Sequence, residues 1–173
     1  MTTRPDDTRL RLVAVGLAIA LVVMTVVAVA LFVLYRSAAA DDDRIAAAEE
    51  GRKLACLYAS ELIAFDYRSL DDYFERMTAG ATGEWKSTFE STVDQTREAV
   101  TGGRTIASAG DVQCGLVTGD DDTATVVIAA GQSIVSGDPP SAPRSTQVYM
   151  VALMSNEDGR WLCSKLVTSL HGD

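Results

Sequence analysis

The 173 residues suffice for one domain with an appendage and are too few for two full domains. The chain carries 15 Lys and Arg against 24 Asp and Glu, and residues 41–173 hold 11 of the cations and 22 of the anions, a net charge of −11. Because phosphate backbones repel so acidic a domain, we expect no nucleic-acid partner.

A long uncharged run, residues 12–35, follows a short polar segment at residues 1–11. Roughly 20 apolar residues span the hydrocarbon core of a bilayer, so the run predicts a transmembrane helix. The alternative is a cleaved signal peptide, for which the alanines at 38–40 offer a cleavage site. The apolar region of a signal peptide is normally only about 7–15 residues long, however, so length favours a retained anchor.

The charges that flank this run predict its orientation. Three arginines precede the run, whereas Arg36 and then the acidic triplet 41–43 follow it. Lys and Arg stay on the cytoplasmic side, so we expect a single-pass protein of the cytoplasmic membrane with residues 1–11 as its cytoplasmic tail. The domain that follows is then extracytoplasmic.

Residues 41–103 predict the helical part of this domain. The segment 41–65 is rich in helix formers, and we expect one apolar stripe of it to face the core. The members of this stripe are Leu54, Leu57, Tyr58, Leu62 and Phe65. A second helix is expected after Ser69, with an apolar face of Leu70, Tyr73, Phe74 and Met77. A third helix, after Thr82, carries the apolar face Trp85, Phe89, Val93 and Val100.

Residues 104–171 predict a four-stranded antiparallel sheet of the same domain. Four apolar or β-branched runs alternate with the turn sequences TGDDD, SGDPPSAP and NEDG. Short connections between successive strands indicate a meander, and Asp158-Gly159 is a strong hairpin signal. Helices followed by strands indicate an α+β fold in which the helices cover one face of a curved sheet.

The third of these runs is apolar on both faces. Val148, Met150 and Met154 alternate with Tyr149, Val151 and Leu153. We expect the face with Tyr149 and Val151 to point away from the helices and to be covered by a partner. The alternative is that a second layer of the same chain covers it.

Signatures of catalysis and of metal binding are weak. His171 is the only histidine, so catalysis by Ser-His-Asp or Cys-His and histidine-based metal sites are not expected. The acidic triplet 120–122 lacks the Gly and the distal Glu of a calcium loop. The candidates for an acid–base site are Asp66, Asp71 and Asp72, close to Tyr67 and Tyr73, but such carboxylates also suit helix ends. We expect no enzyme, no metal and no cofactor.

The three cysteines, Cys56, Cys114 and Cys163, all follow the predicted membrane segment. An extracytoplasmic space permits disulfides, and an odd number leaves at most one intramolecular bridge. Three pairings remain open. The alternative is that all three are small buried hydrophobic residues.

The order of these features resembles the Mce-associated membrane proteins of actinobacteria, over about residues 10–170. The first matching elements are one N-terminal membrane helix and an Ala-rich helix that ends in the triplet Asp66, Tyr67 and Arg68. An ATGEW break that ends at Trp85 follows, and then four strands, the last of which opens with a DGRW motif that ends at Trp161. Together with Tyr149 and Val151, these are the residues for which we expect structural or interaction roles.

The resemblance implies a cystatin-like or nuclear-transport-factor-2-like cone of helices and curved sheet. That shape is also similar to the periplasmic domain of the inner-membrane assembly proteins of type IV secretion. The resemblance further implies an accessory or scaffolding subunit that stabilises an Mce-type lipid transport complex in the cell envelope, in contact with protein partners and with lipid. The alternative is an extracytoplasmic lipid-binding cup or a small cone-fold enzyme, whose apolar pocket Asp66, Tyr67 and Tyr73 would line.

Overall fold

The computed structural model describes residues 5–171, with side chains at 21, 23–32, 35 and 44–169. The chain divides into two compact units, Met1–Asp42 and Asp43–Asp173, which are described separately. In the first unit, residues 5–42 are helical and belong to α1 (Pro5–Leu62). Among the described residues, no helix is long and apolar enough to cross a membrane. The transmembrane helix predicted at 12–35 is therefore not confirmed, and the side chains of 12–20, 22, 33 and 34 lie outside the described residues.

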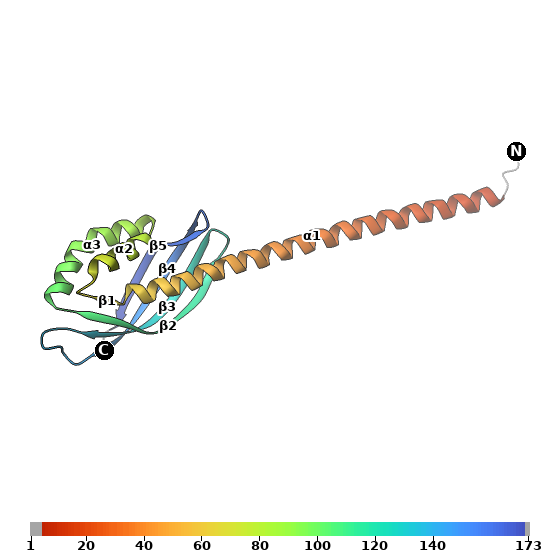
Figure 1. Ribbon diagram of the computed structural model, residues 1–173. Helices are drawn as coiled ribbons and strands as arrows, with labels where there is room; N and C mark the ends of the chain where they lie inside the picture. The colour runs from red at the N-terminus through yellow and green to blue at the C-terminus, as the bar shows by residue number, and fades with distance from the viewer. Residues whose placement is uncertain (1–4, 172–173) are drawn as a thin grey trace. The chain divides into compact units, whose positions relative to one another are not determined.

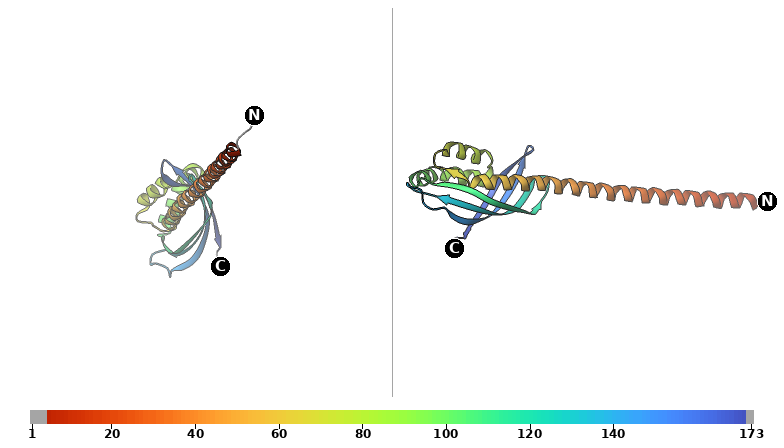
Figure 2. Two further views of the ribbon diagram at one scale, coloured as in Figure 1. Left: turned by 90° about the vertical axis from the view of Figure 1, so that its right-hand side faces the viewer. Right: turned by 60° about the horizontal axis from the view of Figure 1, so that its bottom comes forward.

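In the second unit, helices lie on one face of an antiparallel sheet (Figures 1 and 2). The helices are the last part of α1, α2 (Leu70–Ala79) and α3 (Gly83–Gly102). The strands, in sheet order, are β1 (Phe65–Asp66), β2 (Ile106–Gly119), β3 (Thr123–Val135), β4 (Arg144–Glu157) and β5 (Arg160–His171). This arrangement confirms the α+β class and the meander of the four long strands.

The sheet has five strands rather than the predicted four. The extra strand, β1, consists of Phe65 and Asp66, which pair with Ala107 and Ile106 at the start of β2. Two residues are too few to show the alternation from which a strand is inferred, so sequence patterns do not predict β1.

Irregularities in the ladders bend the long strands. The register shifts between Ala109 and Val112 and between Leu116 and Thr118 in β2, and again at Leu153–Met154 in β4. Such bulges increase the local twist and curl the sheet. At the β4–β5 hairpin, Asp158 and Gly159 have φ values of 53° and 81°, which confirms the predicted two-residue turn.

The core lies between the helices and the face of the sheet that they cover, here called the inner face. From β3 and β4 it contains Ala124, Val126, Ile128, Ala130, Val148, Met150, Ala152 and Met154. The predicted apolar face of α2 is confirmed, because Leu70, Tyr73, Phe74 and Met77 are all buried. Of the face predicted for α3, Phe89 and Val100 are buried, whereas Trp85 and Val93 are partly buried.

The predicted stripe of α1 is wrong in part. Leu54 and Leu57 are 36% and 56% exposed, and the buried face of α1 instead consists mainly of small residues. These are Ala48, Gly51, Ala55 and Ala59, with Tyr58 beside them. A Cβ atom at Gly51 would lie 2.9 Å from a ring carbon of Trp161, so the missing side chain lets α1 approach the sheet closely. A search for large apolar residues at helical spacing overlooks such a face.

Candidate functional site

The triplet Asp66, Tyr67 and Arg68 forms the turn between β1 and α2. The Asp66 carboxylate accepts hydrogen bonds from the backbone N–H and the Nε–H of Arg68, both at 2.9 Å. These bonds hold the pKa of Asp66 below its ordinary value. The Arg68 guanidinium lies 5.7 Å from the centre of the Tyr67 ring. The triplet therefore orders a turn through contacts among its own members.

Tyr73, the third residue of the candidate acid–base site, lies in an aromatic cluster between α2 and α3. Its ring packs against Phe65, Phe74 and Phe89, with centroid distances of 5.3 to 6.3 Å. Its hydroxyl donates to the carbonyl oxygen of Leu62 at 2.9 Å, and burial raises its pKa to about 12. Rings thus fill the space where the sequence suggested a pocket, and Tyr73 is a neutral core residue at ordinary pH.

The two tryptophans also have structural contacts. Trp85 Nε1 donates to the Tyr58 hydroxyl at 2.7 Å, which in turn donates to the carbonyl oxygen of Met77 at 3.0 Å. This chain of hydrogen bonds joins α1, α2 and α3. Trp161, at the start of β5, is buried and covers Gly51 of α1.

Of the three pairings left open by the sequence, the structure contains Cys56–Cys114. This disulfide links α1 covalently to β2 across 58 residues of sequence. Cys163 is a buried free thiol, and burial raises its pKa to about 12, so it is protonated and chemically inert. No local pattern distinguished Cys114 from Cys163, because both lie on strands.

The acidic triplet 120–122 is a turn between β2 and β3. Asp120 Oδ1 accepts hydrogen bonds from the backbone N–H groups of Asp122 and Thr123, at 3.0 and 2.7 Å, which lower the pKa of Asp120. Within the described part of the chain, no three His, Cys, Asp or Glu side chains converge in a way that could hold a metal ion.

Tyr149 and Val151 lie, as expected, on the face of the sheet turned away from the helices, here called the outer face. They are 47% and 42% exposed, and no second layer of described residues covers them. Three further valines on the neighbouring strands are also exposed: Val117 on β2, Val127 on β3 and Val167 on β5. The sequence does not single out these valines, because each follows another apolar residue on its strand, namely Leu116, Val126 and Leu166, which hides the alternation.

Strand register arranges the outer face in two rows across β2, β3, β4 and β5. The first row, here called the valine row, consists of Gly115, Val127, Val151 and Val167. The second, here called the tyrosine row, consists of Gln113, Ala129, Tyr149 and Ser169. All eight line a hollow of about 640 Å³, and none of its described lining residues is charged.

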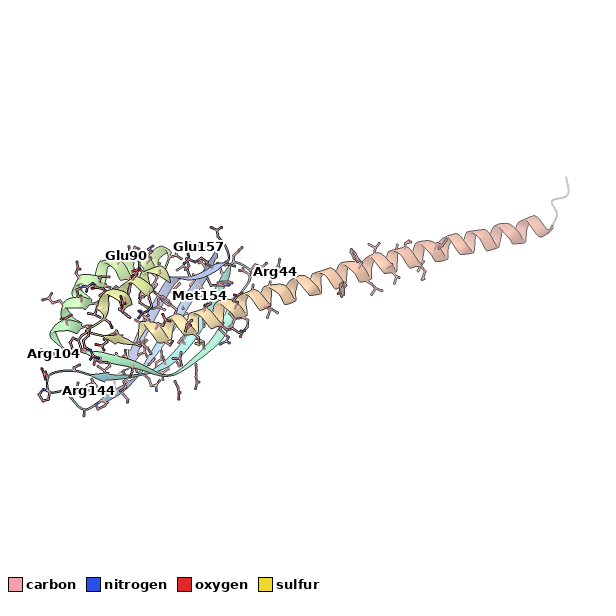
Figure 3. The ribbon with its side chains drawn as sticks, viewed as in Figure 1. Arg44, Glu90, Arg104, Arg144, Met154 and Glu157 are labelled. Atoms are coloured by element: carbon pink, nitrogen blue, oxygen red, sulfur yellow. A yellow bond between two sulfur atoms is a disulfide. The ribbon has the colours of Figure 1, made fainter. Side chains whose placement is uncertain are left out.

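Charged side chains lie on other parts of the domain, including Glu90 on α3 and residues toward its two ends (Figure 3). Arg104 and Arg144 lie at one end, and Arg104 pairs with Asp138 there. Arg44 and Glu157 lie toward the other end, where Arg44 pairs with Asp121. Lys165, on β5 beside the valine row, pairs with Glu84 of α3 at 3.0 Å. An acidic domain thus keeps a patch of uncharged, largely apolar surface.

Comparison with protein families gives a match to the family described as "Uncharacterized protein Rv1363c/MT1408-like", over residues 10–168. A search of curated proteins finds no match.

Several solved structures share the fold. An IcmL-like type IV secretion system protein from Legionella pneumophila is 12% identical, with a TM-score of 0.57 over 70% of this chain and 91% of that one. VirB8 of Agrobacterium tumefaciens is 7% identical, with a TM-score of 0.57 over 74% and 93%. The periplasmic domain of DotI is 11% identical, with a TM-score of 0.54 over 68% and 91%. At such identities the similarity shows a shared fold alone, the nuclear-transport-factor-2-like combination of helices with a curled antiparallel sheet.

Proposed function

The chain belongs to the Rv1363c/MT1408-like family, and we propose that it is a membrane-anchored accessory subunit that stabilises a multi-protein complex at the outer face of the cytoplasmic membrane. The observation that carries this proposal is the exposed apolar outer face of the sheet. Large apolar patches on a domain surface mark sites of interaction, and this one includes Tyr149, Val151 and Val167.

Three further observations support an extracytoplasmic, complex-bound domain. The fold is shared with an IcmL-like type IV secretion system protein and with the periplasmic domain of DotI. The Cys56–Cys114 disulfide suits an oxidising compartment. The uncharged run 12–35 has the length and composition of a membrane anchor, and arginines precede it on the side expected to be cytoplasmic.

For the complex itself, we propose an Mce-type lipid transporter. This rests on the resemblance of the ordered motifs, from the membrane segment to DGRW, to Mce-associated membrane proteins. The mechanism is scaffolding: the anchor holds the domain at the membrane, and the outer face docks on a transporter subunit. No catalytic step is required of the chain.

Site-specific photo-crosslinking in the native membrane tests this proposal. In the full-length chain, Val167 is replaced by p-benzoylphenylalanine, and Leu57 is replaced in a matched control. Both residues are 56% exposed, but Leu57 lies on α1, away from the outer face. We expect position 167 to crosslink to a subunit of an envelope transport complex, and position 57 to give at least five-fold less product. Equal products from both positions, or none from 167, would contradict the proposal.

A lipid-binding cup is a second candidate function, located on the outer face of the sheet rather than beside Tyr73. The space beside Tyr73 is filled, whereas the outer face has a hollow of about 640 Å³. The mass of the crosslinked product distinguishes the two candidates. A lipid adduct at position 167 adds only the mass of one lipid molecule, whereas a protein adduct adds the mass of a whole subunit.

A further inference from the structure

The hollow in the outer face arises from a contrast in side-chain size. Gly115 and Ala129 lie diagonally across β2 and β3 and contribute only a hydrogen atom and a methyl group. Larger side chains line the hollow beside them, from Val127 on β3 and from Tyr149 and Val151 on β4. The floor is therefore low where β2 and β3 meet and is bounded by an aromatic ring and branched side chains.

The hollow by itself has the size of a small-molecule site and makes up only part of a protein-sized interface. Strands are about 4.8 Å apart and residues on one face repeat about every 6.8 Å, so two rows over four strands cover roughly 200–300 Å². A stable protein–protein interface buries about 800 Å² on each partner, so a docked protein must extend well beyond the hollow. The volume of about 640 Å³ falls within the range of about 300–1,000 Å³ that is usual for ligand pockets.

The charge of the lining selects among ligands. No described lining residue is charged, and Lys165, which lies beside the valine row, is paired with Glu84 of α3. Residues 41–173 carry a net charge of −11, which repels an anionic head group. Two polar side chains are available, the amide of Gln113 and the hydroxyl of Ser169, at the two ends of the tyrosine row.

We propose that this hollow binds an uncharged amphiphile. Its hydrocarbon chain lies over the valine row, against the Tyr149 ring, and its neutral, hydrogen-bonding head group lies at Gln113 or Ser169. A monoacylglycerol is the simplest member of this class. The inference rests on the second candidate function, the lipid-binding cup, and names the class of ligand that the cup would take.

Two substitutions can fill the hollow without adding charge. Gly115→Val places β-branched bulk on the floor, where a new Cβ would lie 3.3 Å from a Val127 methyl, a tight contact that a small shift of this exposed side chain relieves. Ala129→Ile does the same in the tyrosine row. Both new side chains favour strands, so we expect the double variant to remain folded. The apolar surface that a protein partner would contact is retained.

The test uses the full-length chain in phosphatidylcholine vesicles and a monooleoylglycerol probe with a diazirine in its acyl chain. After illumination, we expect peptide adducts on the outer-face residues of β2 to β5, reduced at least five-fold in the Gly115→Val, Ala129→Ile double variant. A Leu57→Asp control should keep the full signal. Unlabelled monooleoylglycerol should compete at least ten-fold better than oleate at pH 8, since oleate has the same chain with a negative head.

Two results would overturn the proposal: adducts that the hollow-filling substitutions leave unchanged, or competition by oleate as strong as that by monooleoylglycerol. If the double variant loses its near-ultraviolet circular dichroism, Ala129→Ile alone is compared with the wild type by the same criteria. Absence of outer-face adducts, with position 167 still crosslinked to a transport subunit, would refute the ligand and leave the scaffolding role intact.

Discussion

The two faces of β4 are nearly equal in apolarity and opposite in burial. Val148, Met150 and Ala152 are buried against the helices, whereas Tyr149 and Val151, between them on the same strand, are about half exposed. Apolar composition alone therefore does not decide burial. What distinguishes the inner face is a matched covering layer, including the small residues of α1 that let that helix approach closely.

The lack of a covering layer on the apolar outer face also indicates that this face binds a partner or ligand. A strand with one solvated face normally carries polar residues there. This domain has acidic residues in abundance, yet none lines the hollow among the described residues. Exposed valines and a tyrosine are better explained by a surface that is covered when the protein works.

Introducing a charge on the inner face should reduce the stability of the domain more than any other substitution considered below. Met150→Asp places a carboxylate in the core with no described cation nearby, and a buried unpaired charge costs on the order of 4 kcal/mol or more. We expect loss of cooperative unfolding in urea, followed by circular dichroism. A Met150→Asp chain as stable as the wild type would show that the helices do not cover this face.

The covalent link between α1 and β2 is the next largest contribution. Cys56 and Cys114 are 58 residues apart, and a loop of that length predicts about 4 kcal/mol of stabilisation in the chain-entropy account. The double variant Cys56→Ser, Cys114→Ser should lose roughly this amount in urea titration. Dithiothreitol should destabilise the wild type similarly and should leave the double variant unchanged; any other response to the reductant would contradict this pairing.

Close approach of α1 to the inner face can be tested at Gly51. Gly51→Leu drives a side chain into Trp161 and Ala124, and overpacking of this kind costs about 1–3 kcal/mol. Gly102→Leu is the matched control, because a Cβ atom at Gly102, at the end of α3, would have no neighbour within 4 Å. Equal effects of the two substitutions on the thermal midpoint would argue against close helix–sheet packing.

The smallest effect is expected at the β1–α2 turn, where Arg68 is exposed. Arg68 lowers the pKa of Asp66 in the folded chain, so the carboxylate stabilises the fold above its ordinary pKa of about 3.9. This stabilisation is lost as the pH falls through the lowered folded value. Asp66→Asn should flatten the dependence of unfolding free energy on pH below about pH 4. Arg68→Gln should flatten it similarly; a slope that neither variant changes would show that the pair is not formed in solution.

Sequence patterns predicted those parts of the fold that depend on large residues at regular spacing. The buried face of α2 is one example, and the outward direction of Tyr149 and Val151 is another. The α1 face was missed because alanine and glycine carry little pattern, and β1 because two residues have no period. The cysteine pairing and the hollow depend on which strands are neighbours and in what register, as with Gly115 and Ala129, and no local pattern contains that information.

The most direct test of the account is Val151→Asp in the full-length chain, assayed both for unfolding free energy and for proteins that co-purify from the native membrane. We predict a loss of stability below about 1 kcal/mol, as for an exposed position, together with loss of the associated transport subunits. An unfolded chain would show that the outer face belongs to the core. A folded chain that keeps its partners would show that the outer face is not where they dock.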